Sequence, residues 1–135
     1  MDDPQAARTD PLVLADLVLR PDVTEVSRSR HVIGAVLRRA GCGVDRCDVT
    51  ELIVCELVAN AVAAAASEVR VVVSLRDGTL RVEIHDDGDG EPVVVDPEPL
   101  ADGGRGLRIV TALAAEWGVL AADGGGKTVW VEQPS

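Results

Sequence analysis

The sequence predicts a single α/β domain, because helical and strand patterns alternate along a chain with enough apolar residues for one core. The chain has 135 residues, of which 47% are hydrophobic, and a chain of this length fits one domain. Apolar residues recur at helical spacing in residues 23–39 and 48–66, whereas residues 70–76 and 79–86 alternate as strands. Helices and strands in this order indicate an α/β fold.

The expected elements follow one another in chain order. They are a strand at 12–19, helices at 23–39 and 48–66, strands at 70–76 and 79–86, a helix at 107–117, and strands at 119–121 and 128–132. We therefore expect a flexible N-terminus at residues 1–11 and one domain at residues 12–133.

Local sequence signals place two of the boundaries between these elements. Asp48-Val-Thr-Glu51 looks like a variant capping box at the start of the second helix, although Asp45 offers a start one turn earlier. Asp77-Gly78 between the two alternating strands is the signature of a two-residue hairpin.

Residues 88–104 show neither a helical nor a strand pattern. They contain three prolines, five acidic residues and no Lys or Arg. A stretch of this length without regular structure inside a compact domain indicates a functional lid rather than an ordinary connection.

Composition and charge argue against several classes of protein. The formal net charge is −10, with no Phe or Tyr and two Trp, which disfavours nucleic acid as a partner because phosphate contacts need Lys and Arg, and base stacking needs aromatic rings. No run of 18 apolar residues is present, so we expect no membrane span. The three cysteines form no Cys-x-x-Cys pair, which disfavours zinc and favours a reducing cytoplasm.

The second helix carries a polar pair, Glu56 and Asn60, among Leu, Val, Ala and Cys residues. Residues at i and i+4 share one helix face, and a carboxylate in an apolar setting is costly unless it is hydrogen-bonded, hydrated or catalytic. Two interpretations remain open: a pair that fixes packing, or a functional pair.

Two glycine-containing segments are further candidates for a binding site. Asp86 shares strand parity with the apolar positions of residues 79–86, so it should face the core, and Asp86–Gly90 is either an ordinary turn or a site at the strand end. Gly104-Arg-Gly106 leads into the last helical pattern, where backbone N–H groups could bind phosphate; an ordinary glycine-rich loop is the alternative.

These segments, in this order and followed by Gly126-Lys-Thr-Val129, resemble the nucleotide-binding domain of the GHKL superfamily of ATPases and kinases. Within it the chain is most similar to the small bacterial anti-sigma factor serine kinases, over about residues 12–132. The resemblance implies the Bergerat fold: an α/β two-layer sandwich whose mixed, mainly antiparallel sheet of four or five strands is covered on one face by three helices.

The resemblance also implies ATP and Mg²⁺ as cofactors and a role for each motif residue. Glu56 would be the catalytic base, Asn60 would give an oxygen to Mg²⁺, and Asp86 would accept a hydrogen bond from the adenine amino group. The residues that it assigns to the nucleotide are Asn60, Asp86, Gly88, Gly90, Gly104, Arg105, Gly106, Leu107 and Thr128.

The function that the resemblance implies is a serine/threonine-protein kinase of the bacterial cytoplasm. It would phosphorylate an anti-sigma antagonist of the STAS type and bind a sigma factor. The resemblance is also compatible with a homodimer. The alternative is a catalytically weak or inactive module of the same fold that regulates transcription by protein–protein binding. The acidic composition of residues 88–104 favours this alternative, since anionic groups beside a triphosphate lower its affinity.

Overall fold

The computed structural model describes residues 10–65, 67–88, 116–122 and 125–134. The elements in these ranges are β1 (Leu12–Leu19), α1 (Thr24–Arg39), α2 (Val44–Ala64), β2 (Val69–Arg76), β3 (Thr79–Asp86), β4 (Glu116–Ala121) and β5 (Lys127–Gln133). The strands form one five-stranded sheet in the order β1-β2-β3-β5-β4. Every strand pair in this part of the chain is antiparallel, so the expected sheet is present but without a parallel pair.

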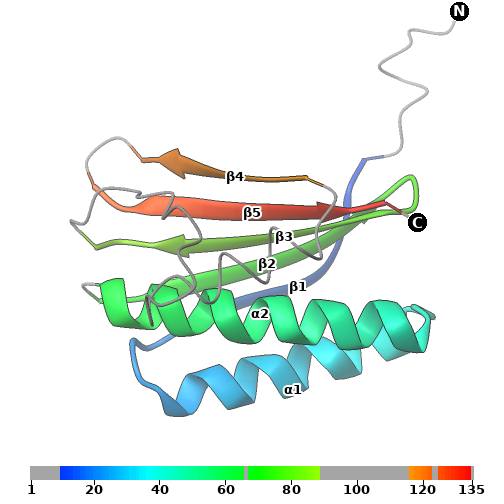
Figure 1. Ribbon diagram of the computed structural model, residues 1–135, viewed down its shortest axis with the longest axis horizontal. Helices are drawn as coiled ribbons and strands as arrows, with labels where there is room; N and C mark the ends of the chain where they lie inside the picture. Colours follow the sequence, from blue (N-terminus) through cyan, green and yellow to red (C-terminus); the bar gives the residue numbers. More distant parts are fainter. Residues whose placement is uncertain (1–9, 66, 89–115, 123–124, 135) are drawn as a thin grey trace, which may run out of the picture.

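The two helices lie side by side on one face of the sheet, which makes the expected two-layer sandwich (Figure 1). Helix α1 contacts β1, while α2 contacts β2 and β3. The alternation of β3 explains this arrangement, because every second side chain from Leu80 to Asp86 is buried and those between are partly exposed. The other face of the sheet is covered by no helix in the described residues.

The core lies between the two helices and the sheet. Its fully buried side chains are aliphatic, and they include Leu19, Ile33, Leu37, Ile53, Val54, Val58, Val69, Val71, Val73, Leu80 and Ile84. Among the described residues no helix is long and apolar enough to cross a membrane.

The second helix begins one turn before the capping box that the sequence suggested. Its N-cap is Gly43, with an extended backbone and no side-chain cap, and the N–H of Cys47 donates to the Gly43 carbonyl at 2.9 Å. The Asp48–Glu51 interpretation is therefore wrong, and the alternative start near Asp45 is correct. In this turn Cys47 is buried, and Arg46 donates to the carbonyl oxygens of Gly78 and Gln133 at 2.6 Å, so these contacts hold the turn without a capping side chain.

The hairpin between β2 and β3 is confirmed at the expected residues. Asp77 has φ 49° and Gly78 has φ 82°, so both central residues are left-handed, as a type I′ turn requires. Strand pairing begins directly outside this turn, at Arg76 and Thr79.

The end of the chain differs from the sequence prediction at β4. Glu116 and Trp117 were expected to end a helix at 107–117, but they begin β4 and pair with Glu132 and Val131. The partly buried Trp117 packs against the core from the strand. Residues 107–115 lie outside the described ranges, so two helices rather than three are seen in the part that the structure describes.

Candidate functional site

Asp86 is a buried carboxylate at the end of β3. Its side chain is 2% exposed, and it lies on the same side of the strand as the core residues Val82 and Ile84. The inward direction expected from strand parity is therefore confirmed. A buried carboxylate is costly unless its oxygens are hydrogen-bonded or paired with a charge.

Both oxygens of Asp86 have donors from the chain itself. The backbone N–H of Gly88 donates to Oδ1 at 3.0 Å. The ammonium of Lys127 lies 2.7 Å from Oδ2, and the Lys127 side chain is 17% exposed. These contacts explain how the charge is tolerated in an apolar setting, because a charge-assisted hydrogen bond is stronger than a neutral one.

Gly88 brings the end of β3 against the end of α2. A Cβ atom built on Gly88 would lie 1.9 Å from the carbonyl oxygen of Ala64, the last residue of α2. A contact this short is impossible for a side chain, so the position needs glycine for close approach. Asn60 lies one turn before Ala64, which places the polar pair of α2 at the same end of the domain as Asp86.

Glu56 and Asn60 lie at the border of the buried face of α2. Both side chains are partly exposed, while the adjacent Leu57 and Ala61 are buried. Within the described residues neither side chain makes a hydrogen bond or an ion pair. The apolar surroundings expected from the sequence are thus present on one side only, which leaves both polar groups accessible to a ligand.

Asp87 links the segment after α2 to the end of β3 through hydrogen bonds. It accepts hydrogen bonds from the backbone N–H groups of Ser67 and Glu68 at 3.0 and 3.3 Å, and from the Ser67 hydroxyl. No local sequence pattern predicts this contact, because it joins residues about twenty positions apart. It holds the Asp86 end of β3 in place beside α2.

Thr128 lies on the opposite face of the sheet from Asp86. It pairs with His85 in the β3–β5 register, and its hydroxyl lies 2.6 Å from Nδ1 of His85. The residue paired with Asp86 is Lys127. The structure therefore brings together Asp86, Gly88 and Lys127, and it directs the Thr128 side chain away from them.

Lys127 was not among the residues that the sequence assigned to the site, and its contact with Asp86 was not expected. Its place depends on the register between β3 and β5, which no local pattern encodes. The preceding Gly126 has φ 90°, and a Cβ atom there would lie 2.4 Å from the Asp86 carbonyl oxygen. The glycine at this position could have indicated that the chain passes close to another backbone.

Part of the expected site lies outside the described residues: Gly90, Gly104, Arg105, Gly106 and Leu107. In the ranges that are described, no group of three or more His, Cys, Asp or Glu side chains could hold a metal ion. This leaves Asn60 as the one described residue that the sequence assigned to a metal.

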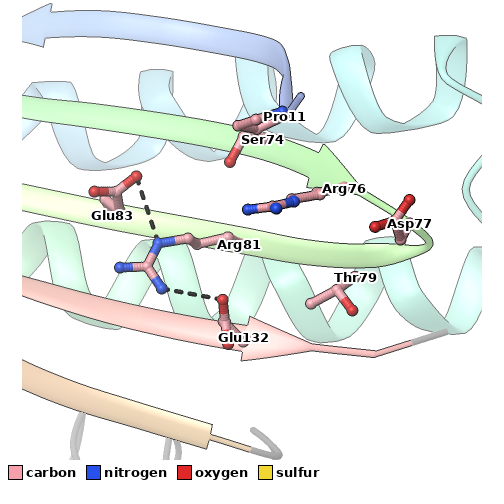
Figure 2. Close-up of a pocket in the computed structure, with 8 residues that line it drawn as sticks. All are labelled: Pro11, Ser74, Arg76, Asp77, Thr79, Arg81, Glu83 and Glu132. Atoms are coloured by element: carbon pink, nitrogen blue, oxygen red, sulfur yellow. Dashed lines mark hydrogen bonds and ion pairs between the residues drawn. The ribbon is translucent and has the colours of Figure 1, made fainter. Parts of the chain in front are cut away.

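A separate hollow of 560 Å³ lies on the uncovered face of the sheet, near the β2–β3 turn (Figure 2). Arg81 crosses it and pairs with Glu83 at 3.6 Å and Glu132 at 3.0 Å, and its guanidinium also lies 4.8 Å from the ring centre of Trp130. The charges of Arg81, Glu83 and Glu132 are thus paired with one another, while Arg76 and Asp77 also line the hollow. Because Arg81 and Asp86 point to opposite faces of β3, the hollow is distinct from the Asp86 site.

Replacing Gly88 by alanine should damage the candidate site. The new methyl group would overlap the Ala64 carbonyl, so β3 and α2 must separate, and we expect a loss of about 1–3 kcal/mol in the free energy of unfolding together with weaker ATP binding. Urea unfolding and calorimetry measure the two effects. Gly43→Ala is the matched control for ATP affinity, since nothing lies within 4 Å of its Cβ position and its φ is −65°; because alanine is a poorer N-cap than glycine, it should lose up to about 1 kcal/mol of stability but no ATP affinity. Equal ATP affinity of the two variants would contradict the close approach.

One comparison with known proteins found a match. A search of curated proteins found no match. The model of the histidine kinase-like ATPase domain matches residues 19–132, which span both helices and all of the strands except most of β1 and the end of β5. Those residues include both halves of the site, on α2 and at the end of β3. The chain therefore belongs to the histidine kinase-like ATPase domain family, an ATP-binding branch of the GHKL superfamily.

Proposed function

We propose that this protein is an ATP-dependent anti-sigma factor serine/threonine kinase of the bacterial cytoplasm. It phosphorylates an anti-sigma antagonist of the STAS type and binds a sigma factor. The observation that carries the proposal is the meeting of two elements at one end of an ATPase-family domain: Gly88 presses the end of β3, with the buried Asp86, against the end of α2, which carries Glu56 and Asn60.

In this proposal Asp86 recognises the adenine base. Its carboxylate can accept a hydrogen bond from the N6 amino group of adenine, whereas guanine presents a carbonyl oxygen at the same position. Two acceptors facing one another would leave a buried polar group unpaired, which is the strongest means of rejecting a wrong ligand. Burial of Asp86 makes that penalty effective, because water cannot fill the gap.

Glu56 acts as the general base and Asn60 supports Mg²⁺. Glu56 is partly exposed, so its carboxylate can receive the proton of a substrate hydroxyl. The amide oxygen of Asn60 suits Mg²⁺, which prefers oxygen ligands and takes only one or two from protein, with water and phosphate oxygens completing the set. When bound, Mg²⁺ neutralises charge on the phosphates of ATP.

The partner proteins have a candidate surface on α1. Arg28, Arg30, Arg38 and Arg39 are all exposed, on a chain of net charge −10. Arg28 pairs with Glu25 of its own helix and Arg38 with Glu51 of α2. An acidic segment of a sigma factor or antagonist would be attracted to this surface, with a salt-dependent rate of association.

The second candidate function is a binding module without kinase activity. The contact between Lys127 and Asp86 favours it, because a carboxylate that already holds an ammonium is a poorer acceptor for adenine. Incubation of the purified protein with labelled ATP, Mg²⁺ and STAS-type antagonists separates the two. Transfer of label to a serine or threonine supports the kinase, whereas ATP binding without transfer to any of them supports the binding module.

Asn60→Ala tests the proposed magnesium ligand. Loss of the amide oxygen should weaken ATP binding in the presence of Mg²⁺ by about tenfold and affect binding in EDTA less, because only the metal complex uses this oxygen. Titration calorimetry with and without Mg²⁺ gives both affinities. A matched control is Asp48→Ala, an exposed position earlier on α2, which should change neither. Equal weakening with and without Mg²⁺ would remove Asn60 from the metal.

A further inference from the structure

Lys127 is paired with the carboxylate of Asp86, which the proposed function assigns to adenine recognition. Its ammonium lies 2.7 Å from Oδ2 of Asp86, and the Asp86 side chain is 2% exposed with this contact in place. Oδ1 is already bonded to the Gly88 backbone N–H at 3.0 Å. A ligand from solvent therefore meets a carboxylate that is covered and has a donor on each oxygen.

The position of Lys127 is fixed by the fold. Residues 86 and 127 are direct partners in the β3–β5 register, so their side chains leave the same face of the sheet at close range. Gly126 has φ 90°, and a Cβ atom built there would lie 2.4 Å from the Asp86 carbonyl oxygen, so a larger residue would disturb this register. Lys127 is also the only lysine in the chain.

Replacing Lys127 by adenine at Asp86 exchanges a stronger hydrogen bond for a weaker one. An ammonium donates to a carboxylate through a charge-assisted hydrogen bond, whereas the amino group of adenine is a neutral donor and gives a weaker one. Lysine has a flexible stem of four carbons and can carry its charge into water, and a side chain that is 17% exposed is already close to solvent. Release of Lys127 is therefore feasible but costs binding energy.

We propose that Lys127 is an internal competitor for the base-recognition carboxylate: its ammonium holds Asp86 in the free protein and must leave Oδ2 before adenine can bind there. The proposal rests on the proposed function, since it assumes that Asp86 is the adenine acceptor. Competition by Lys127 would raise the dissociation constant for adenine nucleotides.

Adenosine and ATP are the probes for this competition, used with the full-length chain. Lys127→Met keeps a long apolar stem and removes the ammonium, so it should bind adenosine and Mg-ATP about tenfold more tightly than wild type, the expected effect of no longer breaking one charge-assisted hydrogen bond. Lys127→Arg keeps a cationic partner for Asp86 and should stay near wild type. Adenosine carries no charge, which separates this effect from simple attraction of the triphosphate by a cation.

A second measurement on the wild type decides the case if Lys127→Met does not fold. Labelling lysine with ¹³C at Cε gives a single side-chain signal, because the chain has one lysine. Saturation with ATP should move this signal to the position of a solvent-exposed lysine. A signal that stays unchanged at saturation would show that Lys127 remains on Asp86.

The outcomes distinguish this proposal from the function on which it rests. Tighter adenosine binding by Lys127→Met, with Lys127→Arg unchanged and the lysine signal displaced by ATP, supports competition. If wild type binds ATP but Lys127→Met binds adenosine no more tightly than wild type does, competition is overturned and the nucleotide function stands. If neither protein binds adenosine or ATP, the nucleotide function fails, and the proposal fails with it.

Discussion

Glu56→Gln will bind Mg-ATP with the affinity of wild type but transfer phosphate about 10²–10⁴-fold more slowly to an antagonist protein. Glutamine keeps the shape and hydrogen-bonding reach of the side chain but cannot accept a proton from the attacking hydroxyl. The position tolerates the change, since Glu56 is partly exposed at the border of the buried face of α2. Fold stability should therefore change little, because a substitution at such a position removes no buried contact.

Single-turnover transfer of labelled phosphate, together with calorimetric ATP affinity, tests this expectation. Glu68→Gln is the matched control, because Glu68 is exposed beyond the end of α2 and the same charge is lost there. Loss of transfer in both variants would attribute the effect to charge alone. Undiminished transfer by Glu56→Gln would remove Glu56 from the chemistry, and another base would have to be found.

Asp86→Ala will be the most destabilising substitution at the site. It leaves the ammonium of Lys127 without its partner beside the core, and the loss of one member of a buried ion pair costs about 3 kcal/mol or more. Because the Lys127 side chain is 17% exposed and can turn toward water, we expect about 3 kcal/mol in urea unfolding, at the lower end of the range. Asp48→Ala, which is exposed on α2, should stay within about 0.5 kcal/mol of wild type. Equal stability of the two variants would mean that the pair with Lys127 contributes nothing.

Asp86→Asn addresses base selection with less damage to the fold. An amide can present its oxygen to adenine or its NH₂ group to the carbonyl of guanine, so the ratio of GTP to ATP dissociation constants should fall by about tenfold or more. The ratio is the useful quantity, since it cancels general losses from a disturbed site. A ratio that remains as in wild type would assign base selection to other residues.

The fold was predictable wherever a local pattern determined the structure. Strand β3 has the expected bounds, Thr79–Asp86, because its apolar residues alternate and Asp77-Gly78 supplies both left-handed turn residues. Strand β4 was less predictable. Its side chains are exposed or only partly buried, so the two-residue alternation is weak, and Glu116-Trp117 fitted a helical pattern equally well.

In the candidate site, too, the features set by a local pattern were predictable and the others were not. The inward direction of Asp86 followed from strand parity, a local property. The Asp86–Lys127 contact joins residues 41 positions apart and depends on the β3–β5 register. The partial exposure of Glu56 could not be predicted either, because α2 is apolar on most sides while the sheet and α1 cover only part of it; Leu52, for example, is 42% exposed.

The most direct test of the central claim is a calorimetric titration of the wild-type protein with ATP and with GTP in the presence of Mg²⁺. Nucleotide concentrations should reach the millimolar range, so that weak binding is still measured. An adenine site read by Asp86 predicts saturable binding of ATP and binding of GTP at least about tenfold weaker, the loss expected when one charge-assisted hydrogen bond cannot form. Equal affinities for the two nucleotides, or no binding of ATP by protein shown to be folded by circular dichroism, would contradict it.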